Sequence, residues 1–253
     1  MINSGAIRKK QGGKASSDVW LAGVDGCRAG WMVAYVRASN GEVRLNVVPQ
    51  FAAIAAAPQA PAVIAVDMPI GLPARIGPQG RGPERAVRAL LGARQSSVFP
   101  VPSREAVYAS SYLDACRVAL STSEPPRSVQ KQLFLIAPKI CEVDRSLRAD
   151  AALAARVFEV HPELAFWRLN GERPLPLPKK VKPGLALRRD LLIAAGYPPA
   201  VIDAPPPKGA GRDDLLDALA CAAIARRIHA GIARSFPEEP QRDECGLPMA
   251  IWA

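Results

Sequence analysis

The chain has 253 residues, of which 33 are Lys or Arg and 23 are Asp or Glu, so its formal net charge at pH 7 is +10. Hydrophobic residues make up 49% and charged residues 22%, which excludes collagen-like, fibrous and largely disordered classes. The length suits one large domain with its own core. The positive charge favours an acidic partner such as nucleic acid, but charge alone does not name a function.

Neither a membrane span nor a disulfide framework is predicted. The longest uncharged stretch, residues 45–66, is interrupted by prolines and glutamines, so it lacks the roughly 20 apolar residues that a membrane helix needs. The five cysteines are odd in number and far apart, which fits neither a set of disulfides nor a zinc site. We therefore expect a cytoplasmic protein without membrane contact. Residues 1–17 are expected to form a disordered basic tail.

The first quarter of the chain predicts a three-stranded meander, a short helix and a fourth strand. Apolar runs at 19–24 and 31–36 flank a glycine-punctuated turn, and residues 43–48 alternate as a half-buried strand does. The alanine-rich residues 51–57 predict one or two helical turns. The evenly apolar residues 62–66 predict a strand that is buried on both faces.

The rest of the chain predicts mostly helices, with a last strand at 157–160. Residues 69–102 are rich in Gly, Pro and Arg, which is typical of a long functional loop or lid holding a short helix near 83–92. Apolar spacing predicts further helices at 104–120, 129–150, 164–169, 185–195 and 213–229. We expect one domain over residues 18–232, with an insertion at about 69–150, followed by a C-terminal extension over 233–253.

Acidic residues stand where these elements begin or end. Asp25 follows the first strand and Asp67 the fourth, so their carboxylates converge if the two strands are neighbours. Asp214 and Asp217 are three residues apart and share one helix face. As alternatives, Asp25 and Asp67 can serve turns and Asp214 can cap its helix. Asp217 lies among apolar residues, where an unpaired carboxylate is costly, so a cation should meet it.

A divalent metal would satisfy all four aspartates. Mg²⁺ and Mn²⁺ take oxygen ligands, commonly carboxylates with water and substrate phosphate. Two such ions activate a water and stabilise the leaving oxygen of a phosphodiester. Carboxylates from two strand ends and one helix suit that chemistry.

Six segments carry a resemblance to a known family: GVDGCRAGW at 23–31, DMPIGLP at 67–73, SVFP at 97–100, PKI at 138–140, EVHPE at 159–163 and DDLLDA at 213–218. Taken in order, they resemble the predicted ribonuclease-H-like nucleases, also called domain-of-unknown-function family 429, over about residues 20–230. The resemblance implies an α/β fold with a mixed five-stranded sheet, an antiparallel three-strand meander plus parallel strands, flanked by helices and carrying a large helical insertion after the fourth strand.

By likeness to the related Holliday-junction resolvases, the resemblance implies that Asp25, Asp67, Asp214 and Asp217 hold Mg²⁺ or Mn²⁺ and are catalytic. The large insertion after Asp67 departs from the resolvases and leaves the substrate open. It could be RNA, DNA or a small phosphate ester.

Glu159 and His161 are the next catalytic candidates, because the last predicted strand would carry them to the sheet's end, where His161 could act as a base. Alternatively, His161 starts a helix with Pro162 and Glu163. Phosphate-binding candidates are the arginines of the inserted segment and their neighbours, although a solvated helix face explains any single arginine as well. The substrate-binding candidates are Arg28, Arg75, Arg94, Ser97, Arg104 and Lys139, with Arg81, Arg85 and Arg88 in the same group and Lys179, Lys180 and Lys182 in a second basic loop.

Together these features predict a metal-dependent nuclease that hydrolyses nucleic acid with a metal-activated water. Two alternatives remain open. One is a non-catalytic nucleic-acid-binding protein of the same fold. The other is a phosphotransferase or nucleotide-binding enzyme that uses the same acids and arginines on a small phosphorylated substrate.

Overall fold

The computed structural model describes residues 18–253, so the predicted basic tail lies outside the described residues. The strands are β1 (Trp20–Cys27), β2 (Gly30–Arg37), β3 (Val43–Val48), β4 (Val63–Val66), β5 (Val157–Glu159), β6 (Ser235–Arg242) and β7 (Pro248–Trp252). They form one sheet in the order β3-β2-β1-β4-β5-β7-β6. The β1–β2–β3 meander is antiparallel, β4, β5 and β7 run parallel to β1, and β6 is antiparallel to β7.

The mixed α/β architecture is confirmed, but the prediction of five strands is wrong. The residues expected to form a C-terminal extension, 233–253, supply β6 and β7, so the sheet has seven strands and β5 is not its last. Strand β6 reads SFPEEPQR and has no apolar alternation. It lies at the sheet edge, where proline and charge are tolerated because one side of the strand needs no hydrogen-bonding partner.

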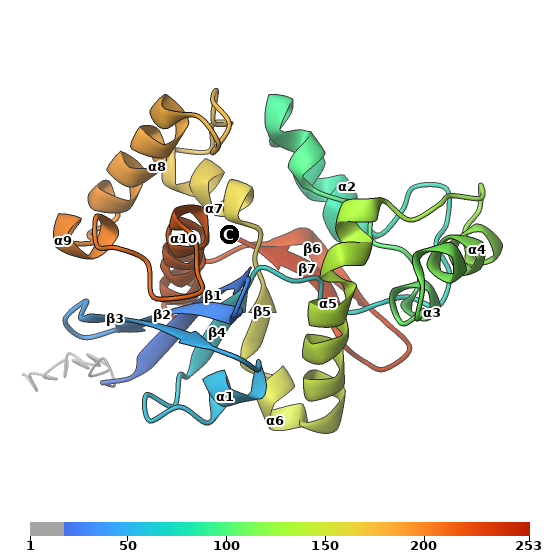
Figure 1. Cartoon of the computed structure of the whole chain (residues 1–253), viewed down its shortest axis with the longest axis horizontal. Helices are drawn as coiled ribbons and strands as arrows, with labels where there is room; N and C mark the ends of the chain where they lie inside the picture. The colour runs from blue at the N-terminus through green and yellow to red at the C-terminus, as the bar shows by residue number, and fades with distance from the viewer. Residues whose placement is uncertain (1–17) are drawn as a thin grey trace, which may run out of the picture.

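Helices cover both faces of the sheet. The helices are α1 (Ala52–Ala55), α2 (Gly82–Arg88), α3 (Arg104–Val107), α4 (Tyr112–Thr122), α5 (Lys131–Ala149), α6 (Ala151–Ala154), α7 (Pro162–Leu169), α8 (Lys182–Ala194), α9 (Pro199–Ile202) and α10 (Arg212–His229), with a 3₁₀ helix η1 (Gly92–Ser97). Helices α7 to α10 lie on one face, and α1, α5 and α6 lie on the other (Figure 1).

Two hydrophobic cores follow from strand alternation. In β1, Leu21 packs into the core beneath α7, α8 and α10, whereas Ala22 and Val24 pack into the core beneath α1 and α5. Asp25 is two residues beyond Gly23 and four beyond Leu21. It therefore shares the face that α10 covers, which places this carboxylate beneath a helix and away from solvent.

The inserted segment is more broken than its periodicity predicts. The helix expected at 104–120 is divided into α3, which ends at Val107, and α4, which Ser111 caps by accepting from the Asp114 N–H at 3.1 Å. The helix expected at 129–150 forms as α5, with Pro138 inside it. Two short helices, α6 and α9, were not predicted. Both have four residues, which is too short for an apolar period to be visible.

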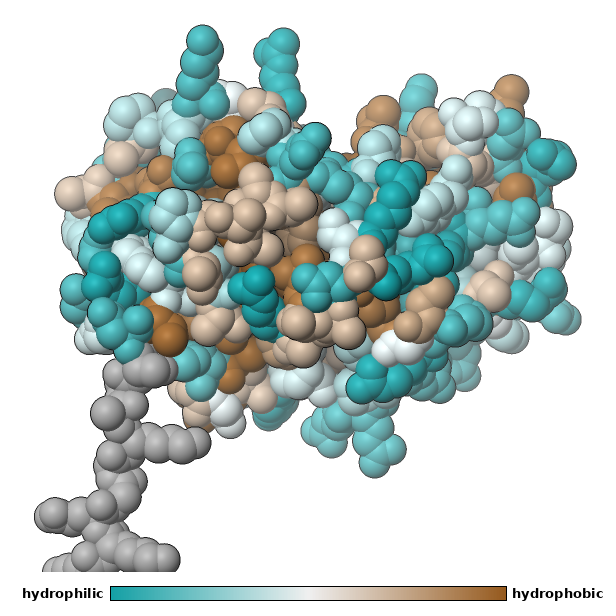
Figure 2. Space-filling view, turned by 90° about the horizontal axis from the view of Figure 1, so that it is seen from below, coloured by the Kyte–Doolittle hydropathy of each residue, from teal (hydrophilic) through white to brown (hydrophobic). Residues whose placement is uncertain are grey.

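The surface is mixed. On the face that Figure 2 shows, hydrophilic residues are interspersed with small hydrophobic patches. Within residues 18–253, none of the helices combines the length and the apolar character needed to cross a bilayer.

Candidate active site

Strand register places Asp25 beside Asp67. The parallel pair β1–β4 aligns Val24 with Val66, and the Asp67 backbone N–H donates to the Val24 carbonyl oxygen at 2.9 Å. Each aspartate is the next residue along its strand, so both carboxylates reach the same end of the sheet. This is the convergence that the sequence predicted for neighbouring strands.

Helix α10 brings Asp217 to the same place. It crosses β1 at Gly23, where an added Cβ would lie 2.1 Å from the Ala218 carbonyl oxygen and the Ala222 nitrogen. A glycine is therefore required for this close approach. Asp217 is 2% exposed, one residue from that contact. The sequence predicted that a cation must meet it, and Lys179 does so, with Nζ 2.5 Å from Oδ2.

Burial is the main cause that raises the pKa values of these carboxyls. Burial raises the pKa of Asp25 well above its ordinary value, and the charges of Asp67 and Asp217 raise it further while Lys179 lowers it. Burial also raises the pKa of Asp67, against the lowering effects of His161 and Lys179. It raises the pKa of Asp217 to about 6 although Lys179 opposes the shift. Lys179 therefore offsets only part of the cost of burying these three carboxyls.

Asp214 lies at the edge of this group. Its Oδ2 accepts a hydrogen bond from the Gly211 N–H at 2.7 Å, so it caps α10, as the alternative interpretation held. Its charge also raises the pKa of Asp25. Burial raises the pKa of Asp214 itself. Capping α10 is compatible with the predicted role as a metal ligand, because the cap uses Oδ2 and leaves Oδ1 of the carboxylate available.

Glu163 is a further carboxylate near the cluster. Its Oε1 accepts from Arg188 at 2.5 Å, whereas its buried Oε2 has no hydrogen-bond partner within residues 18–253. Its charge raises the pKa values of Asp67 and Asp217. The sequence predicted Glu163 at the start of a helix, and it lies in the first turn of α7. The same position brings its carboxylate close to the cluster.

His161 joins a helix cap to the cluster. Its Nδ1 accepts from the Glu163 N–H at 3.2 Å, and its Nε2 lies 3.3 Å from the Ser97 carbonyl oxygen. Because Nδ1 accepts, only Nε2 can donate from this ring to Ser97. His161 lines the same cavity as Asp25 and Asp67, so its catalytic role stays a prediction with a supporting position.

Glu159 lies in a buried ion-pair network. The Nη2 atom of Arg81 is 2.6 and 2.9 Å from its two oxygens, and the Ile70 N–H donates to Oε2 at 2.8 Å. Burial raises the pKa of Glu159 to about 7, although Arg81 lowers it. Both oxygens are engaged, so this geometry favours a positioning role. Arg81 is 3% exposed, which contradicts the expectation that it belongs to a phosphate clamp.

The phosphate-binding candidates differ in how close they lie to the carboxylate cluster. Lys139 Nζ lies 2.5 Å from the Gly30 carbonyl oxygen, beside the turn after Asp25, and Ser97 lines the cavity. Arg28 and Arg75 are exposed, and within residues 18–253 neither forms an ion pair, while Arg94 lies in η1. These positions leave their substrate-binding role as a prediction.

Arg104 is engaged elsewhere. Its Nη2 atom lies 3.1 Å from Asp144 and 2.6 Å from Asp243, so it joins α3, α5 and the β6–β7 turn. An arginine held by two carboxylates has little to offer a phosphate. Sequence reasoning missed these partners because they are 40 and 139 residues away.

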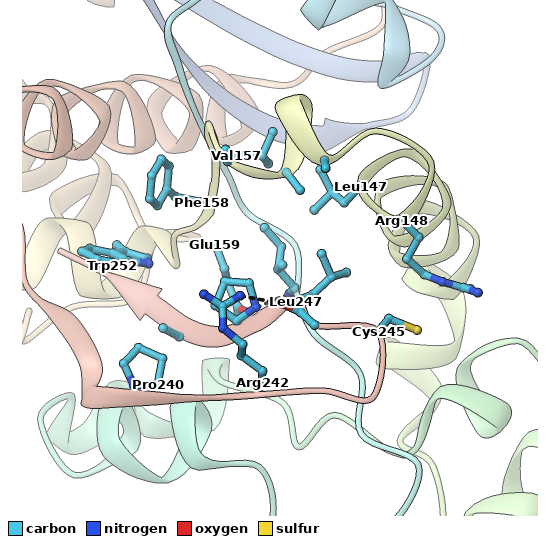
Figure 3. A pocket seen from close by; sticks show the side chains of 17 residues that line it. Leu147, Arg148, Val157, Phe158, Glu159, Pro240, Arg242, Cys245, Leu247 and Trp252 are labelled. Atoms are coloured by element: carbon cyan, nitrogen blue, oxygen red, sulfur yellow. Dashed lines mark hydrogen bonds between the residues drawn. The ribbon is translucent and has the colours of Figure 1, made fainter.

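Two cavities flank the sheet near this end. One of about 220 Å³ is lined by Asp25, Asp67 and His161. The other, of about 600 Å³, lies between the end of α5, β5 and the β6–β7 hairpin, with Arg148, Arg242 and Cys245 around it (Figure 3). None of the clustered aspartates lines the larger cavity, so its size does not make it the candidate site.

The donor chemistry of the cluster fits a hard divalent cation. Asp25, Asp67 and Asp217 offer the carboxylate oxygens that Mg²⁺ and Mn²⁺ prefer. Burial raises their pKa values, and a bound cation would favour their ionised forms. Across residues 18–253, no three His, Cys, Asp or Glu side chains are already arranged to hold a metal ion. Lys179 is the cation in contact with Asp217, so it would compete with a metal for that carboxylate.

The fold and site define a mixed α/β protein with a buried carboxylate cluster where two parallel strands end. The chain belongs to the family described as "Protein of unknown function (DUF429)", which it matches over residues 23–242. The family part of the resemblance is thereby confirmed, and its description states no activity. No curated protein and no solved structure matched the chain.

Proposed function

We propose that this protein is a ribonuclease-H-like, metal-dependent nuclease that hydrolyses phosphodiester bonds in nucleic acid. The observation that carries the proposal is the meeting of Asp25, Asp67 and Asp217 from two adjacent strand ends and one helix. An antiparallel meander followed by strands parallel to the first supports the ribonuclease-H-like assignment. Bound Mg²⁺ or Mn²⁺ supplies activation of the attacking water and stabilisation of the leaving oxygen.

The chain's own residues divide the remaining work. Asp25, Asp67 and Asp217 hold the cation, and Asp214 adds an oxygen at the edge. Lys179 is 35% exposed at its side chain, so it can leave Asp217 and turn toward a phosphate when a metal enters. Lys139, beside the turn after Asp25, adds a second positive charge near the cluster. We place the protein in the cytoplasm, where its five free thiols stay reduced.

The test is cleavage of a mixed panel of single-stranded, duplex, hybrid and branched nucleic acids in Mn²⁺. We expect activity that chelation abolishes and that Asp67→Asn and Asp217→Asn each reduce by at least about a hundredfold. Asp190→Asn is the matched control, because its side chain is 69% exposed and lies outside the cluster. Cleavage that persists in both cluster variants would overturn the proposal.

The Lys179–Asp217 ion pair favours a second candidate, a nucleic-acid-binding protein that keeps the fold without hydrolysis. Lys179 already neutralises the most buried aspartate, as a protein without a metal would require. Tight binding that weakens steeply with salt, with no cleavage under any divalent metal, would favour this candidate over the nuclease.

A further inference from the structure

The larger cavity, of about 600 Å³, shares only one lining residue, Glu159, with the cavity that Asp25 and Asp67 line. It lies between the end of α5, the short helix α6, β5 and the β6–β7 hairpin (Figure 3). Its volume falls within the roughly 300–1,000 Å³ of pockets that take small organic ligands. A ligand bound here would therefore leave the carboxylate cluster free.

The wall of this cavity is largely apolar and partly open to solvent. Phe158 and Trp252 line it from the neighbouring strands β5 and β7, as an edge-to-face pair with ring centroids 5.4 Å apart. Both rings are only partly buried, and Pro240, Pro248 and Ala154 of the same wall are also incompletely covered. Such a surface favours an apolar ligand body, because binding removes apolar area from water.

Arg242 gives the cavity an accessible cation that no carboxylate neutralises. It is exposed on β6, and Figure 3 shows its side chain reaching toward the middle of the cavity. Within residues 18–253 it forms no ion pair, and its Nη1 donates to the Gly246 carbonyl oxygen at 2.6 Å. Its neighbour Asp243 is engaged by three backbone N–H groups and by Arg104. A guanidinium has five N–H donors, so most of those of Arg242 remain for a ligand.

The other charged groups of the lining leave this positive charge in excess. Arg148, exposed at the end of α5, has Asp144 at 3.4 Å, and Asp144 is shared with Arg104. Glu159 is the only acidic residue among the described residues that line the cavity, and Arg81 binds both of its oxygens. The lining thus presents two guanidinium groups and one carboxylate that is already engaged, which favours a ligand with negative charge.

We propose that this cavity binds an amphipathic organic anion, whose apolar body lies against Phe158 and Trp252 and whose anionic group pairs with Arg242. A carboxylate and a phosphate monoester both match the two-point geometry of a guanidinium. A neutral or cationic molecule with the same body would gain the apolar contact alone. Binding needs neither a metal nor nucleic acid, so it goes beyond the proposed nuclease and does not depend on it.

The deciding experiment uses four probes with one naphthalene body: 2-naphthoate, 2-naphthyl phosphate, 2-naphthylmethanol and 2-naphthylmethylamine. Calorimetry or saturation-transfer NMR gives their dissociation constants for the full chain, in chelator and at about 0.15 M salt, which screens attraction to the net charge of +10. We expect at least one anion to bind at least about tenfold more tightly than the alcohol and the amine, and the tighter anion identifies the head group. Equal binding of all four probes, or none at millimolar concentration, would overturn the inference.

Arg242→Met tests the named cation. Because Arg242 is exposed, its replacement should leave the fold intact, lower the affinity for the anion at least about tenfold and leave that for 2-naphthylmethanol unchanged. Arg117→Met removes the same charge on α4, at a side chain that is 77% exposed and lies outside the cavity lining, and should change neither affinity. Anion binding that both variants retain, or that both lose equally, would assign it to the overall positive charge and overturn the inference.

The outcome is separable from that of the proposed nuclease. Anion selectivity in a chain without nuclease activity would reject the nuclease alone. Nuclease activity in a chain without anion selectivity would reject this binding site alone.

Discussion

Lys179 and Asp217 form the contact that most directly controls the candidate site. Asp217 is buried to 2% exposure, and Lys179 reaches it from the loop before α8 with its side chain 35% exposed. The charges of Asp25 and Asp67 also raise the pKa of Lys179, although burial lowers it, and the net shift is upward. The lysine thus remains charged and neutralises part of the cluster. It contacts Asp217, which would otherwise need a bound metal ion as its cation.

Replacing Lys179 with Met should destabilise the protein by about 1–3 kcal/mol at neutral pH, less than the roughly 3–5 kcal/mol for a fully buried pair because the lysine is partly exposed. The lost cation leaves the carboxylates uncompensated, so Mn²⁺ should raise the melting temperature more in Lys179→Met than in the natural chain. Thermal unfolding with and without Mn²⁺ measures both effects. Lys180→Met, at the exposed neighbouring lysine, is the control, and an equal Mn²⁺ effect in all three proteins would contradict the prediction.

The pKa of Asp217 predicts a pH dependence of stability. Burial raises it from 3.8 to about 6, so the folded state favours the protonated carboxyl. The stability that this group contributes is complete below about pH 4 and is lost as the pH rises through about 6, which amounts to roughly 3 kcal/mol. Urea unfolding in chelator should therefore show a fall between pH 4 and 7 that is smaller in Asp217→Asn. An unchanged slope in that variant would show that another group titrates, and Asp190→Asn should keep the full slope.

The sequence could predict the aspartates of the site because each follows from local pattern. Asp25 and Asp67 end apolar strands, and Asp217 interrupts an apolar helix face. It could not predict Arg81 opposite Glu159 or Lys179 opposite Asp217, because those partners are 78 and 38 residues apart. In a chain with 33 basic residues, charge pattern cannot choose which of them becomes buried against which acid.

At the scale of elements, the packing of α10 on β1 assembles the site. The helix backbone lies against Gly23, and the helix then places Asp217 over the end of the strand that carries Asp25. The hydrogen bond from the Gly211 N–H to Oδ2 of Asp214, at 2.7 Å, fixes where this helix begins. The geometry of the cluster therefore depends on one glycine contact and one helix start.

Gly23→Ala should destabilise the fold by about 3 kcal/mol or more, since the new Cβ would lie 2.1 Å from backbone atoms of α10, which cannot rotate away as a side chain can. The shifted helix should also weaken any Mn²⁺ binding. Gly77→Ala is the matched control, because an added Cβ there meets nothing within 4 Å. Chemical denaturation of both variants gives the comparison, and a neutral Gly23→Ala would refute the close approach as the basis of the site.

Elements with a strong period were predicted well, and those set by tertiary contacts were not. The strand expected at 43–48 is β3, Val43–Val48, and the helix expected at 213–229 is α10, Arg212–His229. Apolar spacing predicted one helix over 104–120, although α3 ends at Val107 and a new helix, α4, begins after the Ser111 cap. It also missed β6, whose two prolines and three charged residues are compatible with a strand only at the sheet edge.

At the scale of the whole molecule, the C-terminal hairpin holds the segment that follows β4 against the sheet. Asp243, 7% exposed in the turn between β6 and β7, accepts from the backbone N–H of Leu72, Cys245 and Leu247 at 2.9 Å each. Its Oδ2 also lies 2.6 Å from Arg104. One carboxylate thus joins the segment that follows β4, α3 and the last two strands.

Removing that carboxylate should therefore uncouple several segments at once. We expect Asp243→Ala to lower the free energy of unfolding by about 3–5 kcal/mol, because it removes one of the two carboxylates that hold Arg104 and leaves three backbone donors without their acceptor. Glu244→Ala, at a side chain that is 58% exposed and 4.0 Å from Arg104, should cost less than about 1 kcal/mol. Hydrogen exchange should show the largest loss of protection around Leu72 and in β7, whereas β1 to β3, at the far side of the sheet, should change little. Uniform loss across all strands would mean that the hairpin and the segment that follows β4 unfold only with the whole domain.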